Sequence, residues 1–248
     1  RQRQMCIRDR SYAECKAYIY EISEPGNFDS LYRAHASHPM QMPKGSAITK
    51  TEAADAIYVI SRISGEGADR KAEPGDYYLS EQEEEELKAI AECYDNTIVI
   101  LNVGGVMDVS FLEKYNIAAL VMLSQAGMEG GNALADVLSG AVTPSGKLTD
   151  TWGCRYEDYP SGATFSHNNG NIIEEKYYEG IYVGYRYFDS FEVEPRYPFG
   201  YGMSYTTFDV ATENAAWKPD AEPKTITVTV KVTNTGSCAG KELSLIHI

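Results

Sequence analysis

Three short apolar runs, separated by polar stretches, give the chain its clearest pattern. The runs cover residues 57–60, 97–103 and 117–123 and are rich in β-branched and aromatic side chains. Continuously apolar runs of this length are typical of strands that are covered on both faces in a parallel sheet. The pattern therefore predicts three buried strands, and a further short strand is expected at residues 17–22.

Helices are predicted between these strands. Ser80 is followed three residues later by Glu83, which is the capping-box pattern that begins a helix. An apolar stripe at helical spacing follows and extends the helix to about Tyr94: Leu87, Ile90, Ala91 and Tyr94. We interpret the acidic residues Glu81 and 83–86 as a solvated face of this helix.

The alternation of strands and helices continues downstream. Residues 108–115 predict a short helical passage, and the glycines of residues 127–131 open another helix that Gly140 closes. Four apolar residues of that helix are expected to face inward: Ala133, Leu134, Val137 and Leu138. This order predicts an α/β fold for residues 17–152, a layered α/β sandwich with a mostly parallel sheet and right-handed crossovers.

The pattern changes after Trp152. Residues 153–208 are rich in aromatic residues and glycine, and we interpret them as a structured connector. From Lys224 the chain alternates strictly between apolar and polar residues, which predicts a half-buried antiparallel strand with these residues inward: Ile226, Val228, Val230 and Val232. A β-sandwich of about seven strands would begin in residues 209–242, so we expect an incomplete sandwich with an edge prone to association.

Composition and charge narrow the classes of partner. With 43% hydrophobic and 23% charged residues among 248, the chain is typical of a globular protein, and no apolar run approaches the length of a membrane span. The net charge of −14 repels polyanions, which argues against nucleic acid and anionic membranes as partners. Five scattered cysteines contain no C-x-x-C pair, so we expect neither a metal site nor a disulfide framework, and a reducing compartment such as the cytoplasm is favoured.

Both ends of the chain differ from the rest. Residues 1–16 open with RQRQMCIRDR, which has neither an apolar period nor a signal-peptide core, and residues 243–248 read LSLIHI. The segments MCIRDR and LSLIHI resemble translated sequencing-adapter read-through. We exclude both ends from the fold and expect the chain to be part of a longer protein.

The candidate catalytic group follows the first predicted strand. The sequence Ser64-Gly65-Glu66-Gly67 ends that strand abruptly, and reactive groups gather at the carboxyl ends of strands in open α/β sheets. The two glycines leave Glu66 without adjacent side chains to shield it from a ligand. The alternative is a polar turn in which Glu66 pairs with Arg70 or Lys71 in solvent.

Two glycine-rich segments suggest phosphate binding but do not meet its requirements. Residues 140–148, GAVTPSGKL, have one residue too many between the glycines and lack Ser or Thr after Lys147, which we expect to anchor a structural turn. Glu129 would repel an anion from the helix start at residues 127–131. We therefore predict no nucleotide or other cofactor.

Five ordered motifs connect the chain to a known family. They are GEG at residues 65–67 with Asp69-Arg70, NVGGVMDVSFLEKY at 102–115, GMEGGNALADVLSGAVTPSGKLTDTW at 127–152, YYEGIYVGYRYF at 177–188 and YPFGYGMSYTTF at 197–208. Over about residues 53–240 the chain resembles the α/β sandwich domain of glycoside hydrolase family 3, followed by the first part of the fibronectin III-like domain of that family.

The resemblance implies a retaining β-glycosidase, most often a β-glucosidase, that removes terminal β-linked sugars from oligosaccharides or glycosides. It implies that Glu66 is the general acid/base and that Asp69 and Arg70 support its loop or contact substrate. For each of these two residues singly, the alternative is a simple ion pair at the surface. The nucleophile is implied to be an aspartate on a separate (β/α)8 barrel, which we expect downstream in the same polypeptide. The isolated chain is then expected to be inactive.

Two other function classes stay open. One is a non-catalytic carbohydrate-binding or scaffold module, which a complete polypeptide without a barrel would favour. The other is a nucleotide- or coenzyme-binding α/β domain, against which the incomplete phosphate-loop patterns argue.

Overall fold

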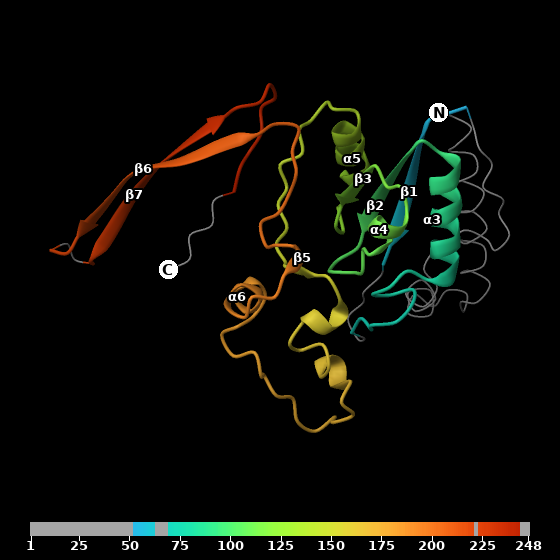
Figure 1. Ribbon diagram of the computed structural model, residues 1–248, viewed down its shortest axis with the longest axis horizontal. Coiled ribbons are helices and arrows are strands. Elements are labelled where there is room, and N and C mark those ends of the chain that lie inside the picture. The colour runs from blue at the N-terminus through green and yellow to red at the C-terminus, as the bar shows by residue number, and fades with distance from the viewer. Residues whose placement is uncertain (1–51, 63–68, 221–222, 244–248) are drawn as a thin grey trace. The chain divides into compact units, whose positions relative to one another are not determined.

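The computed structural model describes residues 52–62, 69–220 and 223–243 (Figure 1). The chain separates into two compact units, Arg1–Met128 with Cys154–Lys176 and Glu129–Gly153 with Tyr177–Ile248. The strand predicted at residues 17–22 and the segment that contains Glu66 lie outside the described residues. The domain boundaries predicted at residues 17–152, 153–208 and 209–242 stay predictions.

The first unit is built on a three-stranded parallel sheet in the order β1-β2-β3. The strands are β1 (Asp55–Ser61), β2 (Asn96–Asn102) and β3 (Ala119–Met122). In register, Ile60 lies opposite Leu101, and Leu101 lies opposite Met122. The parallel sheet predicted from the apolar runs is therefore confirmed.

Two helices connect these strands, and two short 3-10 turns occur later in the same unit. Helix α3 (Glu81–Cys93) contacts β1 and β2, and α4 (Phe111–Lys114) precedes β3 (Figure 1). Ser80 caps α3 through the predicted capping box, and Leu87 is fully buried. The 3-10 turns are η1 (Tyr156–Asp158) and η2 (Phe165–His167).

The core of this unit is centred on β2 and the turn that follows it. Its fully buried side chains include Ile60 and Leu87 and these residues of β2 and the adjoining segments: Val99, Ile100, Leu101, Val103, Met107 and Phe111. In β3, by contrast, no residue is buried, and in β1 only Ala56 and Ile60 are buried while Ile57 is 55% exposed. The prediction of three buried strands is therefore wrong for β3 and only partly correct for β1. The reason is their position, because among the described strands each pairs only with β2 and is an edge of this sheet.

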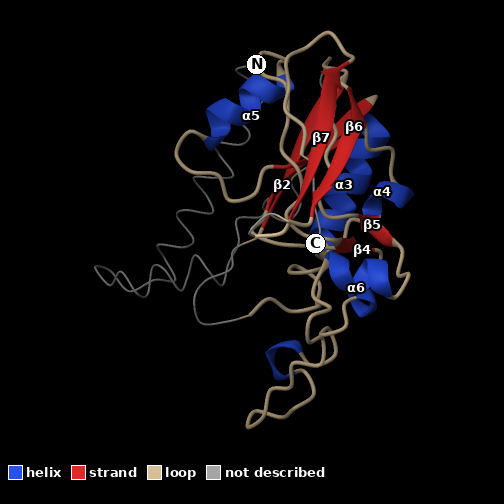
Figure 2. Cartoon of the chain, turned by 90° about the vertical axis from the view of Figure 1, so that its left-hand side faces the viewer, coloured by secondary structure: helices blue, strands red, loops and turns tan. Residues whose placement is uncertain are grey.

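The second unit contains α5 (Gly130–Leu138), α6 (Tyr185–Ser190) and two small antiparallel sheets. One sheet pairs β4 (Trp152–Gly153) with β5 (Pro195–Tyr197), and the buried side chains of this unit include Trp152 of β4 and Phe188 of α6. The other pairs β6 (Phe208–Lys218) with β7 (Thr225–Asn234), which lie side by side as a long ribbon in Figures 1 and 2.

Helix α5 ends where the sequence predicts. Gly140 adopts a left-handed conformation with φ of 77°, and its N–H donates to Val137 O at 3.0 Å. The predicted inward face is only partly correct, because Leu134, Val137 and Leu138 are half-buried whereas Ala133 is exposed.

The hairpin of β6 and β7 is more exposed than its alternating sequence predicts. Val232 lies opposite Val210 and Ile226 lies opposite Trp217, so the apolar side chains of both strands share one face. Every residue of β7 is nevertheless exposed, and the prediction of a half-buried strand is wrong for the described structure. An alternating strand is half-buried only when a second layer covers its apolar face, and no other described strand pairs with this sheet.

Lys147 has the structural role predicted for it. Its Nζ donates to Gly202 O at 2.7 Å and forms an ion pair with Glu242 at 3.0 Å. Gly202 allows this close approach, since a Cβ at that position would collide with Gly146 O.

Among the described helices of both units, none is long and apolar enough to cross a membrane.

Candidate active site

The candidate site lies where β1 ends, and the described residues on both sides of the Glu66 segment define its frame. Glu66 itself lies outside the described residues. Arg62 precedes that segment directly, and Asp69 and Arg70 follow it. The frame is therefore built from the contacts of these three residues.

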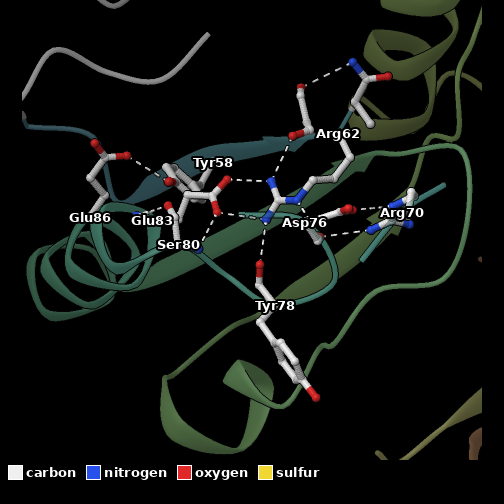
Figure 3. Close-up of polar contacts among 10 residues, drawn as sticks. Tyr58, Arg62, Arg70, Asp76, Tyr78, Ser80, Glu83 and Glu86 are labelled. Carbon is white, nitrogen blue, oxygen red and sulfur yellow. Dashed lines mark hydrogen bonds and ion pairs between the residues drawn. The ribbon is translucent and has the colours of Figure 1, made fainter. Parts of the chain in front are cut away.

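Arg62 is the buried anchor on the strand side. Only 6% of its surface is exposed, and its Nη1 and Nη2 donate to the two carboxylate oxygens of Glu83 at 2.7 and 2.8 Å (Figure 3). Its Nε donates to Asp76 O at 2.7 Å, and the remaining N–H groups reach the backbone oxygens of Ser61 and Tyr78. All five donors of the guanidinium group are thus used, which is the condition for burying it at low cost.

Glu83 corrects the prediction of a wholly solvated acidic face on α3. It is buried, with 7% of its surface exposed, because it binds Arg62 while its Oε2 also accepts the Ser80 N–H at 2.8 Å. Two neighbouring carboxylates are bound as well: Glu86 accepts from the Tyr58 hydroxyl at 2.8 Å, and Glu84 forms an ion pair with Lys114 at 2.9 Å. Exposed side chains on this helix include Glu81 and Glu85, as predicted.

Arg70 is the anchor on the other side of the Glu66 segment. Its Nε donates to Asp76 Oδ1 at 2.6 Å and its Nη2 to Asp76 O at 2.9 Å (Figure 3). Its Nη1 donates to Val106 O at 2.8 Å. The second carboxylate oxygen of Asp76 accepts the Lys71 N–H at 2.6 Å. Arg70 is therefore held by the turn at Asp76 and by the segment after β2.

Asp69 and Arg70, the two residues predicted to support the Glu66 loop, differ in their contacts. Arg70 binds Asp76, whereas Asp69 is exposed and has no polar partner among the residues that the structure describes. Lys71, the other proposed partner of Glu66, lies 4.0 Å from Glu73 with both side chains largely exposed. An ion pair, the alternative role expected for each residue, is therefore present for Arg70 and absent for Asp69 within the described residues.

Sequence reasoning missed Arg62, Asp76 and Glu83 as parts of this frame. One signal was available for Arg62, because an arginine directly after a buried strand needs a carboxylate near it. Glu83 lies at the N3 position of the capping box, which holds its side chain in place at the start of the helix.

Burial also affects the tyrosines near this frame. It raises the pKa of Tyr58, and the charge and hydrogen bond of Glu86 raise it further. Burial likewise raises the pKa of Tyr77, with contributions from Tyr159 and Asp108. Both hydroxyls therefore keep their protons throughout the physiological pH range and act as neutral donors.

A hollow of about 360 Å³ lies in the first unit beside Tyr78, lined also by Glu84 of α3, Lys114 of α4 and the segment around Arg155. Its charged groups are largely paired, since Lys114 binds Glu84 and Ser110 donates to Asp108 at 2.6 Å. Burial alone would raise the pKa of Glu84, but the hydrogen bonds from Lys114 and Tyr115 lower it. Within the described ranges, no group of three or more His, Cys, Asp or Glu side chains is arranged to hold a metal ion.

Known proteins resemble this chain in sequence over most of its length. A family model described as the glycosyl hydrolase family 3 C-terminal domain matches residues 14–205. A β-glucosidase from Ruminococcus albus is 38% identical over 238 residues, which cover 94% of this chain and 24% of that protein. β-Glucosidase A from Butyrivibrio fibrisolvens is 40% identical over 229 residues, which cover 77% of this chain and 27% of that protein.

Solved structures agree with these relatives. The structure of β-glucosidase 3B from Thermotoga neapolitana in complex with glucose matches 74% of this chain and 26% of its own, with a TM-score of 0.66 and 41% identity. A β-glucosidase from Paenibacillus barengoltzii matches 74% of this chain and 20% of its own, with a TM-score of 0.68 and 41% identity. The chain spans about a quarter of the length of the curated relatives named above.

These matches confirm the α/β architecture and the family resemblance that the five motifs indicate. The residues matched by the family model include Arg62, Arg70 and Asp76, which form the frame on both sides of the Glu66 segment. The chain therefore belongs to glycosyl hydrolase family 3, to its C-terminal domain, and is β-glucosidase-like.

Proposed function

We propose that this chain is the part of a retaining β-glycosidase that supplies the general acid/base, and that Glu66 is this residue. The proposed reaction removes terminal β-linked sugars from oligosaccharides or glycosides. The observation that carries the proposal is the frame at the end of β1, where Arg62 and Arg70 hold both sides of a Gly-Glu-Gly sequence. The identity of 38% with a β-glucosidase over 94% of the chain supports it.

The chemistry requires two carboxylates about 5 Å apart, one as nucleophile and one as acid/base. In the proposed mechanism, Glu66 first donates its proton to the glycosidic oxygen as the sugar is transferred to the nucleophile. It then accepts a proton from the water that releases the sugar. The nucleophile is proposed to be an aspartate on a (β/α)8 barrel of the same polypeptide.

The test is Glu66→Gln in the full-length polypeptide, because an amide cannot donate the proton that a poor leaving group requires. A disaccharide should lose about 10²–10⁴-fold in the rate of glycosyl transfer to the enzyme. A glucoside of an acidic phenol needs little protonation, so this step should be much less affected for it. Azide needs no general base and should restore turnover by forming a β-glycosyl azide.

The matched control is Glu73→Gln, which removes an exposed carboxylate that is close to Glu66 in the sequence. This variant should hydrolyse both substrates like the wild type. If Glu66→Gln lowers the rates on the glucoside of the acidic phenol and on the disaccharide equally, and azide restores neither, Glu66 is excluded as the acid/base. Asp69 would then be the next candidate. A binding module without catalysis would show no turnover even in the wild-type polypeptide.

A further inference from the structure

Asp76 is the residue on which both sides of the Glu66 segment converge. Its backbone oxygen accepts from Arg62 Nε at 2.7 Å and from Arg70 Nη2 at 2.9 Å (Figure 3). Its carboxylate accepts from Arg70 Nε at 2.6 Å and from the Lys71 N–H at 2.6 Å. One residue therefore contacts the chain directly before the segment and directly after it.

The network around Asp76 is itself tied to the sheet and to α3. Arg62 is fixed by the buried carboxylate of Glu83, which the capping box holds at the start of α3. Arg70 is fixed by Val106 O, in the segment that follows β2. The N–H of Asp76 donates to Glu73 O at 3.2 Å, so the turn that presents Asp76 is closed as well.

The contacts of the Asp76 carboxylate are the part of this network that a substitution of its side chain removes. Hydrogen bonds between a guanidinium and a carboxylate are charge-assisted and directional, so they orient Arg70 as well as attract it. The backbone contacts of Asp76 would survive a change of its side chain, whereas the contacts to Arg70 Nε and to the Lys71 N–H would not. The side chain therefore controls mainly the downstream end of the segment.

We infer that Asp76 is a positioning residue that orients the acid/base of the reaction by holding Arg70 and Lys71, an inference that rests on the proposed function of Glu66. Proton transfer depends steeply on placement, and a displacement of about 1 Å can lower a rate about 100-fold. Asp76 needs no contact with substrate to act in this way.

The experiment is Asp76→Asn in the full-length polypeptide, with kcat and KM measured on a disaccharide and on the glucoside of an acidic phenol. The amide nitrogen would face one of the two donors that the carboxylate now binds, so one hydrogen bond is lost with little change in volume. We expect kcat on the disaccharide to fall about 10–100-fold more than kcat on the glucoside of the acidic phenol, with KM little changed.

A second variant, Arg70→Lys, decides the question if Asp76→Asn does not fold. It keeps the positive charge, but one ammonium group cannot reproduce the three contacts made by Nε, Nη1 and Nη2. The same dependence on the leaving group is expected. Glu73→Gln is the control in the same loop, and thermal unfolding of each variant separates a loss of folded protein from a loss of rate.

The outcomes distinguish this inference from the function on which it rests. If Glu66→Gln shows selective loss on the disaccharide but Asp76→Asn and Arg70→Lys lose both activities equally, or neither, the positioning role is wrong. If Glu66→Gln itself shows no selectivity, the proposed function fails and the positioning role fails with it. Selective loss in all three variants supports both.

Discussion

Arg62 and Glu83 form a buried ion pair in which each group also has other partners. Glu83 accepts the Ser80 N–H, and Arg62 donates to three backbone oxygens. A buried pair of this kind adds little net stability, because the desolvation of both charges offsets their attraction. Losing one partner is different, since it leaves an uncompensated charge in the interior.

We predict that Glu83→Ala lowers the free energy of unfolding by about 3–5 kcal/mol, because it leaves Arg62 buried without its carboxylate. Glu85→Ala is the matched control on the same helix, where the side chain is exposed, and it should change the free energy by less than about 0.5 kcal/mol. Denaturant unfolding of both variants measures the difference. Similar values for the two would show that the ion pair is not formed in solution.

The sequence predicts the candidate acid but not the residues that frame it. Glu66 stands out because glycines flank it after an apolar run, which is a local signal. Arg62 and Glu83 are 21 positions apart, and Arg70 and Val106 are 36 positions apart. Such contacts depend on how α3 and β2 pack beside β1, and no single segment of sequence carries that information.

At the scale of elements, local patterns predict the existence of helices and strands better than their burial. The capping box of Ser80 and Glu83 lies within one turn, so it identifies the start of α3 correctly. The apolar runs of β1 and β2 likewise identify paired strands. The burial of β3 and β7 was predicted wrongly, because it depends on which other element covers each strand.

We predict that amide hydrogen exchange is faster in residues 226–232 of β7 than in residues 98–102 of β2. The hairpin pairs only β6 with β7 and leaves its apolar side chains exposed, whereas β2 is central in its sheet and largely buried. Segments with few buried contacts open at lower free energy. Mass-spectrometric exchange on the intact chain measures both segments together, and equal protection would show that another layer covers the hairpin.

At the scale of the whole molecule, the chain corresponds to about a quarter of its curated relatives. We predict that the purified chain alone does not hydrolyse an aryl β-glucoside. Double displacement needs a nucleophile in addition to an acid/base, and the proposed mechanism takes that nucleophile from a barrel. A full-length polypeptide under the same conditions is the positive control. Measurable turnover by the chain alone would contradict the prediction, and turnover that Glu66→Gln does not diminish would indicate a different active site.

The convergence of Arg62 and Arg70 on Asp76 also has a consequence for evolution. Because one residue accepts hydrogen bonds from both arginines, a substitution at any one of these three positions changes the contacts of the others. The effects of substitutions at residues in contact are not additive. We therefore expect a lineage to retain or replace Arg62, Arg70 and Asp76 together, rather than one at a time.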